Sequence, residues 1–307
     1  MIKFSLRQLE YAVEAADKKS VAAAALQFDV SQPTVSAAIK VLEDRLGFHI
    51  FVRQAAKGIA PSPQGLRFIS EARALLAHAR DVESIAKSVE RGIEGELRVG
   101  SFLTLGPTYM PGLISAFSER HPHVAITPEE GDQEKLLDGL RSGRLDAALL
   151  YRVDLPADIR ARDVALLKPH VILPHNHRLA RHGRVALRDL EGEPFIALNT
   201  EPSRTYFLRV LATAGVRPGP GFSSASIEMV RGMVACGMGY SLLITRPPGD
   251  MSYDGKKIAV RSIRDVVEDG VVALVMLRNL RRTKLVQAFE EFCVQHFHRI
   301  GRTSGKA

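Results

Sequence analysis

Residues 20–47 constrain this chain more than any other segment, because they predict two short helices joined by a tight turn. The segment opens on Ser20, which can cap the first helix, and a run of alanines follows as strong helix formers. The pair Asp29-Val30 interrupts that helix before Ser31 offers a second N-cap. Pro33 then fits the first turn of the second helix, where its missing N–H costs nothing. The segment therefore predicts a helix-turn-helix.

The second helix has one apolar face and one face that suits DNA. Its apolar side chains recur at spacings of three and four residues, so they form a stripe that belongs in a core: Val35, Ala38, Ile39, Leu42 and Leu46. The opposite face carries small or hydroxyl side chains and one cation: Pro33, Thr34, Ser36, Ala37 and Lys40. Such side chains favour a helix that enters the DNA major groove. On the pattern alone, an ordinary helical hairpin fits equally well.

Five motifs follow one another in a characteristic order and spacing: Phe4-Ser-Leu-Arg-Gln-Leu, Ser31-Gln-Pro-Thr-Val-Ser, Leu42-Glu, Leu46-Gly-Phe-His-Ile-Phe-Val-Arg53 and Pro61-Ser-Pro-Gln-Gly65. Together they resemble the N-terminal domain of LysR-type transcriptional regulators, and the last is similar to the segment that opens the family's linker helix. Val21 and Phe28 stand where the family usually has Phe and Leu. Ala23 and Leu26 stand where it often has polar residues, which bears on phosphate contacts from the first helix.

The resemblance implies an all-α winged helix-turn-helix over residues 1–63 that binds double-stranded promoter DNA. Two short apolar runs flank the loop 54–58, as in a two-stranded wing. Arg53 and Lys57 are then available to phosphates or the minor groove, with solvated loop cations as the alternative. The expected DNA-binding residues are Ser31, Gln32, Pro33, Thr34, Ser36, Lys40 and Arg53.

Residues 64–92 predict one long linker helix. After Gly65 the stretch to Arg91 contains neither Gly nor Pro, and apolar residues recur at threes and fours, for a length of roughly 40 Å at 1.5 Å per residue. A single apolar stripe on so long a helix requires a partner, and a homodimer is the simplest source. Gly92 and Gly95 then predict a hinge. The resemblance implies that two dimers form a homotetramer that bends the promoter.

Beyond Gly95, short apolar runs alternate with amphipathic stretches of helical length. We expect strands at 97–100, 124–128, 145–151, 195–198, 240–244 and 271–277, and helices at 107–119, 133–141, 203–214, 226–236 and 284–297. This alternation predicts an α/β domain with doubly wound parallel sheets. The resemblance implies two lobes like those of periplasmic binding proteins. Lobe I is expected at about 93–166 and 265–302, lobe II at about 167–264, and a flexible tail at 303–307.

An effector site is expected between the lobes, because ligands of open α/β sheets bind beyond the carboxyl ends of the strands. Hydroxyls, an amide and two cations, Arg152 and Arg204, follow the expected strands and suit a small anionic carboxylate. The expected effector-binding residues are Ser101, Phe102, Thr104, Tyr151, Asn199, Thr200, Ser203, Arg204, Ser226 and Ile227. Helix capping is the alternative for Ser203 and Ser226. Phe102, Tyr206 and Phe222 fit a core better than a pocket.

Chain length, net charge, cysteine number and the length of the apolar runs limit the classes of protein that this chain can belong to. With 307 residues, of which 46% are apolar, the chain can bury one large core or two to three smaller ones. A net charge of +8 and a pI near 9.6 suit a polyanion partner. We expect Cys236 and Cys293 to be buried structural thiols, with oxidant sensing as the alternative. The sequence shows no targeting segment and no apolar run of membrane-spanning length, so a cytoplasmic protein is expected.

The sequence indicates no catalytic, metal or cofactor constellation. The pairs His121/His123 and His175/His177 are too closely spaced for a helical zinc site and are expected in surface loops. The sequence 237–241 places its serine after both glycines, which is not a nucleophile elbow. We therefore expect an effector-controlled transcriptional regulator without a cofactor. The alternatives are a ligand-binding protein that no longer regulates, which steep salt-dependent DNA binding would exclude, and an enzyme, which a turnover screen would reveal.

Overall fold

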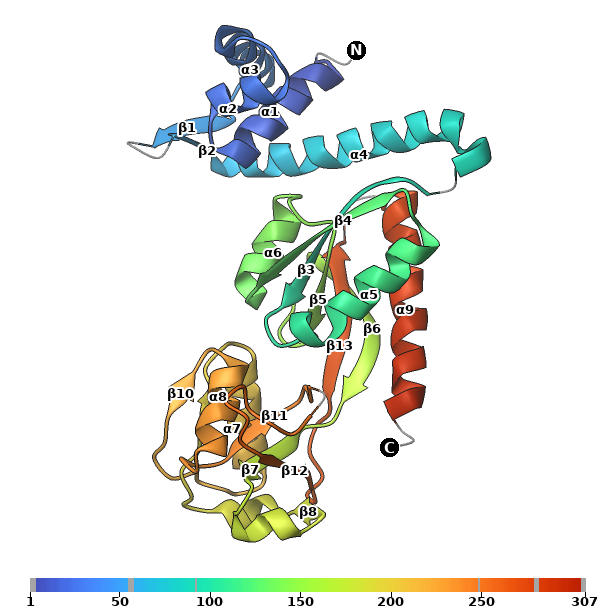
Figure 1. Ribbon diagram of the computed structural model, residues 1–307. Coiled ribbons are helices and arrows are strands. Elements are labelled where there is room, and N and C mark those ends of the chain that lie inside the picture. Colours follow the sequence, from blue (N-terminus) through green and yellow to red (C-terminus); the bar gives the residue numbers. More distant parts are fainter. Residues whose placement is uncertain (1–3, 55–57, 92, 248, 279–281, 305–307) are drawn as a thin grey trace.

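The computed structural model describes residues 4–54, 58–91, 93–247, 249–278 and 282–304. Figure 1 shows four parts along its length: the N-terminal domain, a long helix beneath it, and two α/β lobes stacked below. Lys57, which the sequence makes available to phosphates or the minor groove, lies outside the described residues.

The N-terminal domain is a winged helix-turn-helix. Its elements are α1 (Leu6–Lys18), α2 (Val21–Gln27), α3 (Gln32–Leu46), β1 (Phe51–Gln54) and β2 (Gly58–Pro61), and the two strands pair antiparallel. The predicted caps are confirmed, because Ser20 accepts a hydrogen bond from the backbone N–H of Ala23 and Ser31 from that of Thr34. The predicted core stripe is also present: Val35, Ile39 and Leu42 are buried, and Ala38 and Leu46 half-buried.

Part of the apolar stripe of the linker helix α4 (Pro63–Arg91) packs against the N-terminal domain of the same chain. Ile69, Ala72 and Leu76 are buried against Leu9 and Ala12 of α1. The prediction that the whole stripe awaits a partner helix is therefore wrong, because the N-terminal domain covers part of it. Among the side chains of α4 that the structure describes, the large apolar ones that remain exposed are Leu66, Leu75 and Val82.

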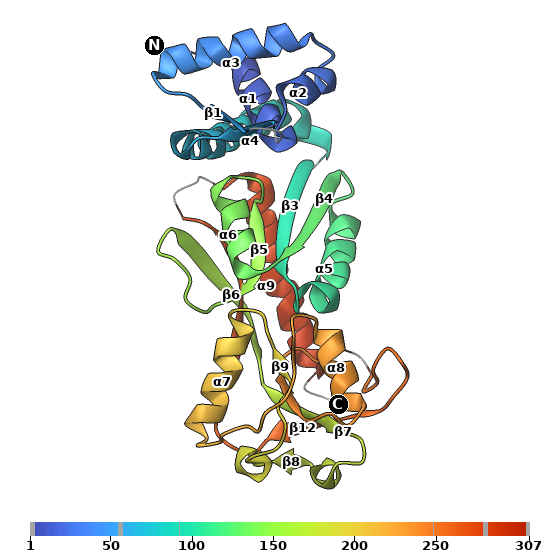
Figure 2. The same cartoon turned by 90° about the vertical axis from the view of Figure 1, so that its left-hand side faces the viewer.

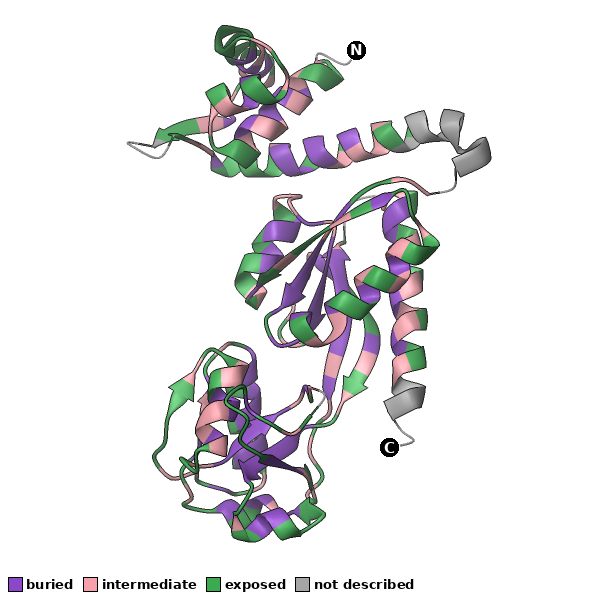
Figure 3. Cartoon of the chain, in the orientation of Figure 1, coloured by how far each residue is buried: buried purple, intermediate pink, exposed green. Residues whose placement is uncertain are grey.

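Lobe I is built on a five-stranded sheet in the order β4-β3-β5-β13-β6. Its strands are β3 (Gly95–Phe102), β4 (Val124–Gly131), β5 (Ala147–Tyr151), β6 (Ile159–Leu167) and β13 (Gly270–Leu277), and its helices are α5 (Gly106–Arg120), α6 (Gln133–Arg141) and α9 (Lys284–Ser304). In Figure 2, α5 and α6 flank the sheet on opposite sides. Figure 3 shows the buried residues concentrated in the strands between these helices.

Lobe II is built on a four-stranded sheet in the order β11-β7-β12-β8. Its strands are β7 (His170–Pro174), β8 (Arg184–Val185), β9 (Ala197–Leu198), β10 (Ser223–Ser224), β11 (Ser241–Leu243) and β12 (Ile258–Ile263), of which β9 and β10 form a separate parallel pair. Its helices are α7 (Ser203–Thr213) and α8 (Ile227–Ala235), with two 3-10 turns, Arg178–Arg181 and Leu187–Leu190. The second apolar core lies between them.

The chain passes between the lobes twice, from β6 to β7 and from β12 to β13. The return path explains why the sheets are mixed. Strands β3, β4 and β5 are parallel as predicted, but β13 enters lobe I from lobe II and pairs antiparallel with both β5 and β6. In lobe II, β7 pairs antiparallel with β11 and β12. The α/β two-lobed fold is confirmed, whereas wholly parallel sheets are not found.

Two burial predictions were wrong. Cys293 is buried in the core of lobe I, but Cys236 is exposed because α8 ends at Ala235 and the thiol follows the last buried turn. Phe222 is also exposed, at 52%, since it precedes the short edge strand β10 rather than a core helix. Within the described residues, no helix is long and apolar enough to cross a membrane, and no cluster of His, Cys, Asp or Glu could hold a metal ion.

Candidate functional site

One face of the N-terminal domain presents the residues expected to bind DNA. All seven are exposed: Ser31, Gln32, Pro33, Thr34, Ser36, Lys40 and Arg53. The hydroxyls of Ser31 and Thr34 lie 2.7 Å apart and complete the cap of α3. The side chains of Gln32, Ser36 and Lys40 make no hydrogen bond or ion pair with any described residue, so their polar groups face solvent. The helix therefore offers hydroxyl, amide and ammonium groups that suit base edges and phosphates.

Glu43 holds the wing against α3, a role that the sequence pattern did not indicate. Its carboxylate accepts hydrogen bonds from the backbone N–H of Ile50, at 2.7 Å, and of Phe51, at 3.2 Å. It also lies 3.3 Å from the imidazole of His49. Because β1 begins at Phe51, this contact fixes where the wing leaves the helix and so where Arg53 lies.

The first helix of the motif offers DNA an apolar contact. Leu26 of α2 is 82% exposed, and Ala23 is half-buried and carries no polar group. Side-chain hydrogen bonds to phosphates from these two positions are thus impossible. Backbone and van der Waals contacts remain available to α2, because an apolar side chain can pack on sugars or thymine methyl groups.

A small cavity lies between the lobes at the carboxyl end of β5. Its volume is about 40 Å³, and it is lined from lobe I by Tyr151 and Arg152 and from lobe II by Ser203, Tyr206 and Phe207. Figure 2 shows that α7, which carries these lobe II residues of the lining, lies directly below lobe I. Of the expected effector residues, the cavity thus brings together Tyr151 and Ser203. Tyr206, which was expected in the core, is buried and also lines the cavity.

The lobe I part of the expected site is packed behind Tyr151. The phenol and the hydroxyl of Thr104 lie 2.9 Å apart, and the Tyr151 ring meets Phe102 edge to face at 5.4 Å. Phe102 is fully buried and belongs to the core, as its alternative assignment predicts. Burial raises the pKa of the Tyr151 phenol well above its usual value, so the group stays neutral and acts by hydrogen bonding.

Three buried hydroxyls have no hydrogen-bond partner among the described residues, and one of them, the Tyr240 phenol, lies in the core of lobe II while the other two belong to the expected effector set. Those two are Ser101 Oγ, at the end of β3 in lobe I, and Thr200 Oγ1, after β9 in lobe II. They come from opposite lobes. A buried hydroxyl without a partner costs about 1–3 kcal/mol, which a ligand that bonds to it can recover.

The remaining expected residues belong to lobe II and do not line this cavity. Arg204 stands in the first turn of α7, exposed and without a side-chain partner among the described residues. Asn199 is exposed after β9, and Ile227 is half-buried at the start of α8. Ser226 caps α8, because its hydroxyl accepts a hydrogen bond from the backbone N–H of Met229, so the alternative of helix capping is confirmed for this residue. It is wrong for Ser203, since α7 has no side-chain cap.

Ion pairs balance the charges at the rim of the cavity. Arg152 pairs with Asp163 at 3.1 Å, and Arg209 pairs with Glu268 at 3.3 Å. The phenol of Tyr206 donates to the carbonyl oxygen of Glu268, which ties α7 to the segment that returns to lobe I. Arg204 does not line this cavity, but it is an exposed cation in the first turn of α7 without a side-chain partner among the described residues, and one such cation suits a single carboxylate better than a polyanion.

Comparisons with known families match both halves of the chain. Residues 6–66 match the model of the bacterial regulatory helix-turn-helix protein of the lysR family, and residues 90–298 match that of the LysR substrate binding domain. The hydrogen peroxide-inducible genes activator of Dickeya chrysanthemi is 30% identical over 247 residues, which cover 78% of each chain.

Two solved structures extend the likeness to nearly the whole chain. HinK, a LysR family transcriptional regulator from Pseudomonas aeruginosa, is 39% identical, with 96% of this chain and 99% of that chain covered at a TM-score of 0.66. A full-length variant of OxyR from Pseudomonas aeruginosa is 26% identical, with 95% and 98% covered at a TM-score of 0.78. The likeness therefore includes the helix-turn-helix, the linker and both lobes.

Proposed function

This chain belongs to the LysR family of transcriptional regulators, and on that premise we propose that its α3 face reads a promoter sequence under the control of a small carboxylate bound between the lobes. Members of the family are DNA-binding regulators with an effector-binding domain, not enzymes, and so is this chain. The observation that carries the proposal is the exposed polar face of α3, whose hydroxyl, amide and ammonium groups at Gln32, Ser36 and Lys40 make no bond within the described chain.

In this proposal a dimer places two recognition helices in successive major grooves of double-stranded DNA. The contacting residues are Ser31, Gln32, Pro33, Thr34, Ser36, Lys40 and Arg53. Leu75 and Val82 support a dimer through α4, because both are exposed on the surface that α1 leaves uncovered. Two dimers would then form a tetramer, as the family resemblance implies.

The effector is proposed to engage the hydroxyls of Ser101 and Thr200, which have no partner among the described residues, with Arg204 binding its carboxylate. The cavity between the lobes, at about 40 Å³, has room for little more than one water molecule. A carboxylate of several heavy atoms can bind only when the lobes move apart. The effector therefore favours a more open arrangement of the lobes, and it alters activity through its different affinity for the two arrangements.

Fluorescence anisotropy of the full chain with DNA from upstream of its own gene tests the DNA-binding part. We expect selective binding over unrelated DNA of equal length and a steep loss of affinity with salt. Thr34→Glu places a bulky acid on the exposed face and should abolish selective binding. The control is Ala212→Glu, which adds the same charge to an exposed position of α7 in lobe II. Equal operator affinity in both variants would refute the assignment of α3 as the recognition helix. Weak, unselective DNA binding by the parent chain would instead favour a ligand-binding protein without a regulatory role.

The effector part needs a separate screen of small carboxylates for an effect on operator affinity. Arg204→Ala should shift the dose response to higher concentration by roughly tenfold or more, as expected for loss of one charge-assisted contact. Arg217→Ala, which removes an exposed cation from a loop of lobe II, should leave it unchanged. An identical dose response in Arg204→Ala would remove this residue from the site without affecting the DNA assignment.

A further inference from the structure

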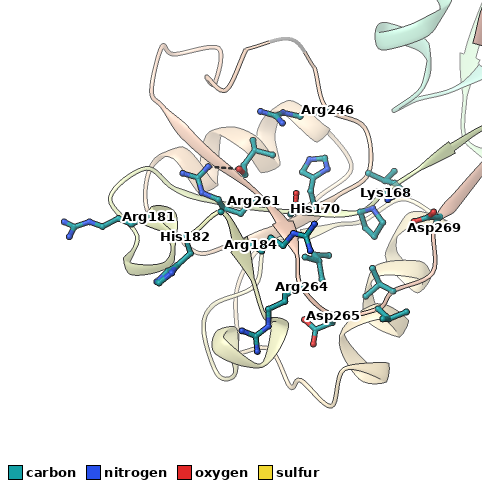
Figure 4. A pocket seen from close by; sticks show the side chains of 18 residues that line it. Lys168, His170, Arg181, His182, Arg184, Arg246, Arg261, Arg264, Asp265 and Asp269 are labelled. Carbon is teal, nitrogen blue, oxygen red and sulfur yellow. Dashed lines mark hydrogen bonds between the residues drawn. The ribbon is translucent and has the colours of Figure 1, made fainter. Parts of the chain in front are cut away.

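Lobe II carries a large hollow that is separate from the cavity between the lobes. Its volume is about 860 Å³, and β7, β8, β12 and the segments beside them form its walls. Only Ile244 and Asp269 line both spaces in the described part of the chain. Figure 4 shows basic side chains on every side of the hollow, with His170 near its centre. The cations in its lining are Lys168, Arg181, Arg184, Arg246, Arg261 and Arg264.

The lobe II sheet holds these cations together although they come from distant parts of the sequence. Parallel pairing of β8 with β12 sets Arg184 opposite Ser262, between Arg261 and Arg264 in the sequence. The backbone N–H of Arg264 continues this pairing with a hydrogen bond to the carbonyl oxygen of Val185 at 2.8 Å. Arg184 and Arg261 thus lie on strands of the sheet, and the other four cations lie in the segments beside it: Lys168, Arg181, Arg246 and Arg264.

Most of this positive charge has no carboxylate partner. The side chains of Lys168, Arg181, Arg184 and Arg264 make no hydrogen bond or ion pair with any described residue. Arg261 donates to the carbonyl oxygens of Ala180 and Val260, which hold its guanidinium in place without neutralising it. Among the cations of the lining, Arg246 alone has a carboxylate partner in the described chain, Asp250 at 3.0 Å.

The acids of the lining do not offset the cations. Six cations stand against two carboxylates among the described residues, Asp265 and Asp269. Asp265 already accepts the backbone N–H of Leu187 at 2.8 Å. Burial lowers the pKa of His170 to about 4, so near neutral pH its imidazole is uncharged and adds a polar group rather than a charge. Like charges gathered in one concavity raise the local concentration of anions.

From this arrangement we propose that lobe II has a second binding site, for a small polyanionic metabolite that carries phosphate groups. Guanidinium groups match phosphate oxygens with paired N–H donors, and five arginines line this hollow. The described lining contains no Phe, Tyr or Trp, so it offers no aromatic platform for a nucleobase and favours a ligand recognised by its charges. The cavity between the lobes differs in charge, because the two cations of its described lining, Arg152 and Arg209, are each paired with a carboxylate.

Isothermal titration calorimetry of the full chain with inorganic pyrophosphate tests this site. We expect binding that weakens with salt, and a loss of affinity of roughly tenfold or more in the double variant Arg184→Ala/Arg264→Ala. Both side chains are exposed and unpaired within the described chain, so the variant should fold normally. Arg217→Ala controls for net charge on the same lobe, and Arg204→Ala controls for binding in the cleft; both should keep the parent affinity.

Four results would overturn the proposal. One is absence of binding at millimolar pyrophosphate, and another is unchanged affinity in the double variant. A third is equal weakening by Arg217→Ala, which would show attraction by general surface charge, and the fourth is loss of binding in Arg204→Ala, which would place the anion in the cleft. Unchanged pyrophosphate affinity together with a loss of DNA affinity in the double variant would identify a nucleic-acid surface instead. None of these outcomes bears on the DNA-binding role of α3.

Discussion

Replacing Glu43 with Ala should detach the wing from the recognition helix. The carboxylate accepts two backbone hydrogen bonds, from Ile50 at 2.7 Å and from Phe51 at 3.2 Å, and the Glu43 side chain is only 15% exposed. Hydrogen bonds to a charged group contribute about 1.5–3 kcal/mol each, and the longer one belongs at the low end of that range or below it. Loss of both should lower the free energy of opening at the start of β1 by about 2–4 kcal/mol.

Hydrogen exchange of the backbone amides measures this change directly. A loss of about 2–4 kcal/mol corresponds to roughly 30- to 700-fold faster exchange at Ile50 and Phe51, since about 1.4 kcal/mol is a factor of ten. The matched control is Asp44→Ala, because Asp44 is the next residue, is exposed, and has no side-chain partner among the described residues. Both variants remove one negative charge beside the DNA-binding face.

Operator affinity then distinguishes the loss of the wing's position from the loss of one negative charge. Asp44→Ala should bind DNA as well as the parent or slightly better, because a negative charge near the phosphates is gone. Glu43→Ala gains the same electrostatic advantage but loses the position of Arg53, so its selective affinity should fall below that of the control. Exchange rates and operator affinities that are the same in the two variants would refute the role assigned to Glu43.

Three further predictions concern the rest of the chain. Leu75→Glu combined with Val82→Glu should dissociate the proposed dimer in analytical ultracentrifugation, and an unchanged sedimentation coefficient would exclude α4 as the interface. The pKa of His170, about 4 in the fold, lies below its unfolded value of about 6.5, so the unfolded state binds more protons between these values. Stability should fall by up to about 3 kcal/mol as the pH drops from 6.5 to 4, and His170→Gln should flatten this slope in urea unfolding. Hydrogen peroxide should form no intrachain disulfide, because Cys236 ends α8 in lobe II whereas Cys293 is buried in lobe I; intact-mass measurement without reductant checks this.

Local patterns predicted the N-terminal domain well because its elements depend on neighbours in sequence. Ser20 and Ser31 cap helices within three residues of themselves, and the stripe Val35, Ile39 and Leu42 follows from helical periodicity. The wing was predicted as a hairpin, but the contact that fixes it was not. Glu43 looks like an ordinary surface acid in the sequence, and its role depends on where the chain returns seven residues later.

Predictions were weaker where pairing partners are distant in sequence. Strands β6, β7 and β12 were missed, although β13, which pairs with β6 across roughly a hundred residues, was found from its continuous apolar run. Strands β6 and β12 mix polar and apolar residues, so their pattern alone does not mark them as strands, whereas β7 has an apolar run of only three residues, Val171 to Leu173. The basic hollow of lobe II was missed for the same reason, because its cations occupy separate stretches that only the sheet brings together.

The side chain of Arg73, on α4, contacts both the N-terminal domain and lobe I. Its guanidinium pairs with Asp17 of α1 at 2.5 Å, while its aliphatic stem lies against Gly143 of lobe I, where a Cβ would come within 2.9 Å of Arg73 Cδ. Arg73 also lines a small pocket together with Arg98 and Asp146, which form an ion pair of lobe I at 3.8 Å. Because this buried side chain of α4 touches both α1 and lobe I, a motion of lobe I against α4 changes the packing around the Arg73–Asp17 pair. A change in the lobes thus has a direct mechanical route to the helix pair that carries the DNA-binding face.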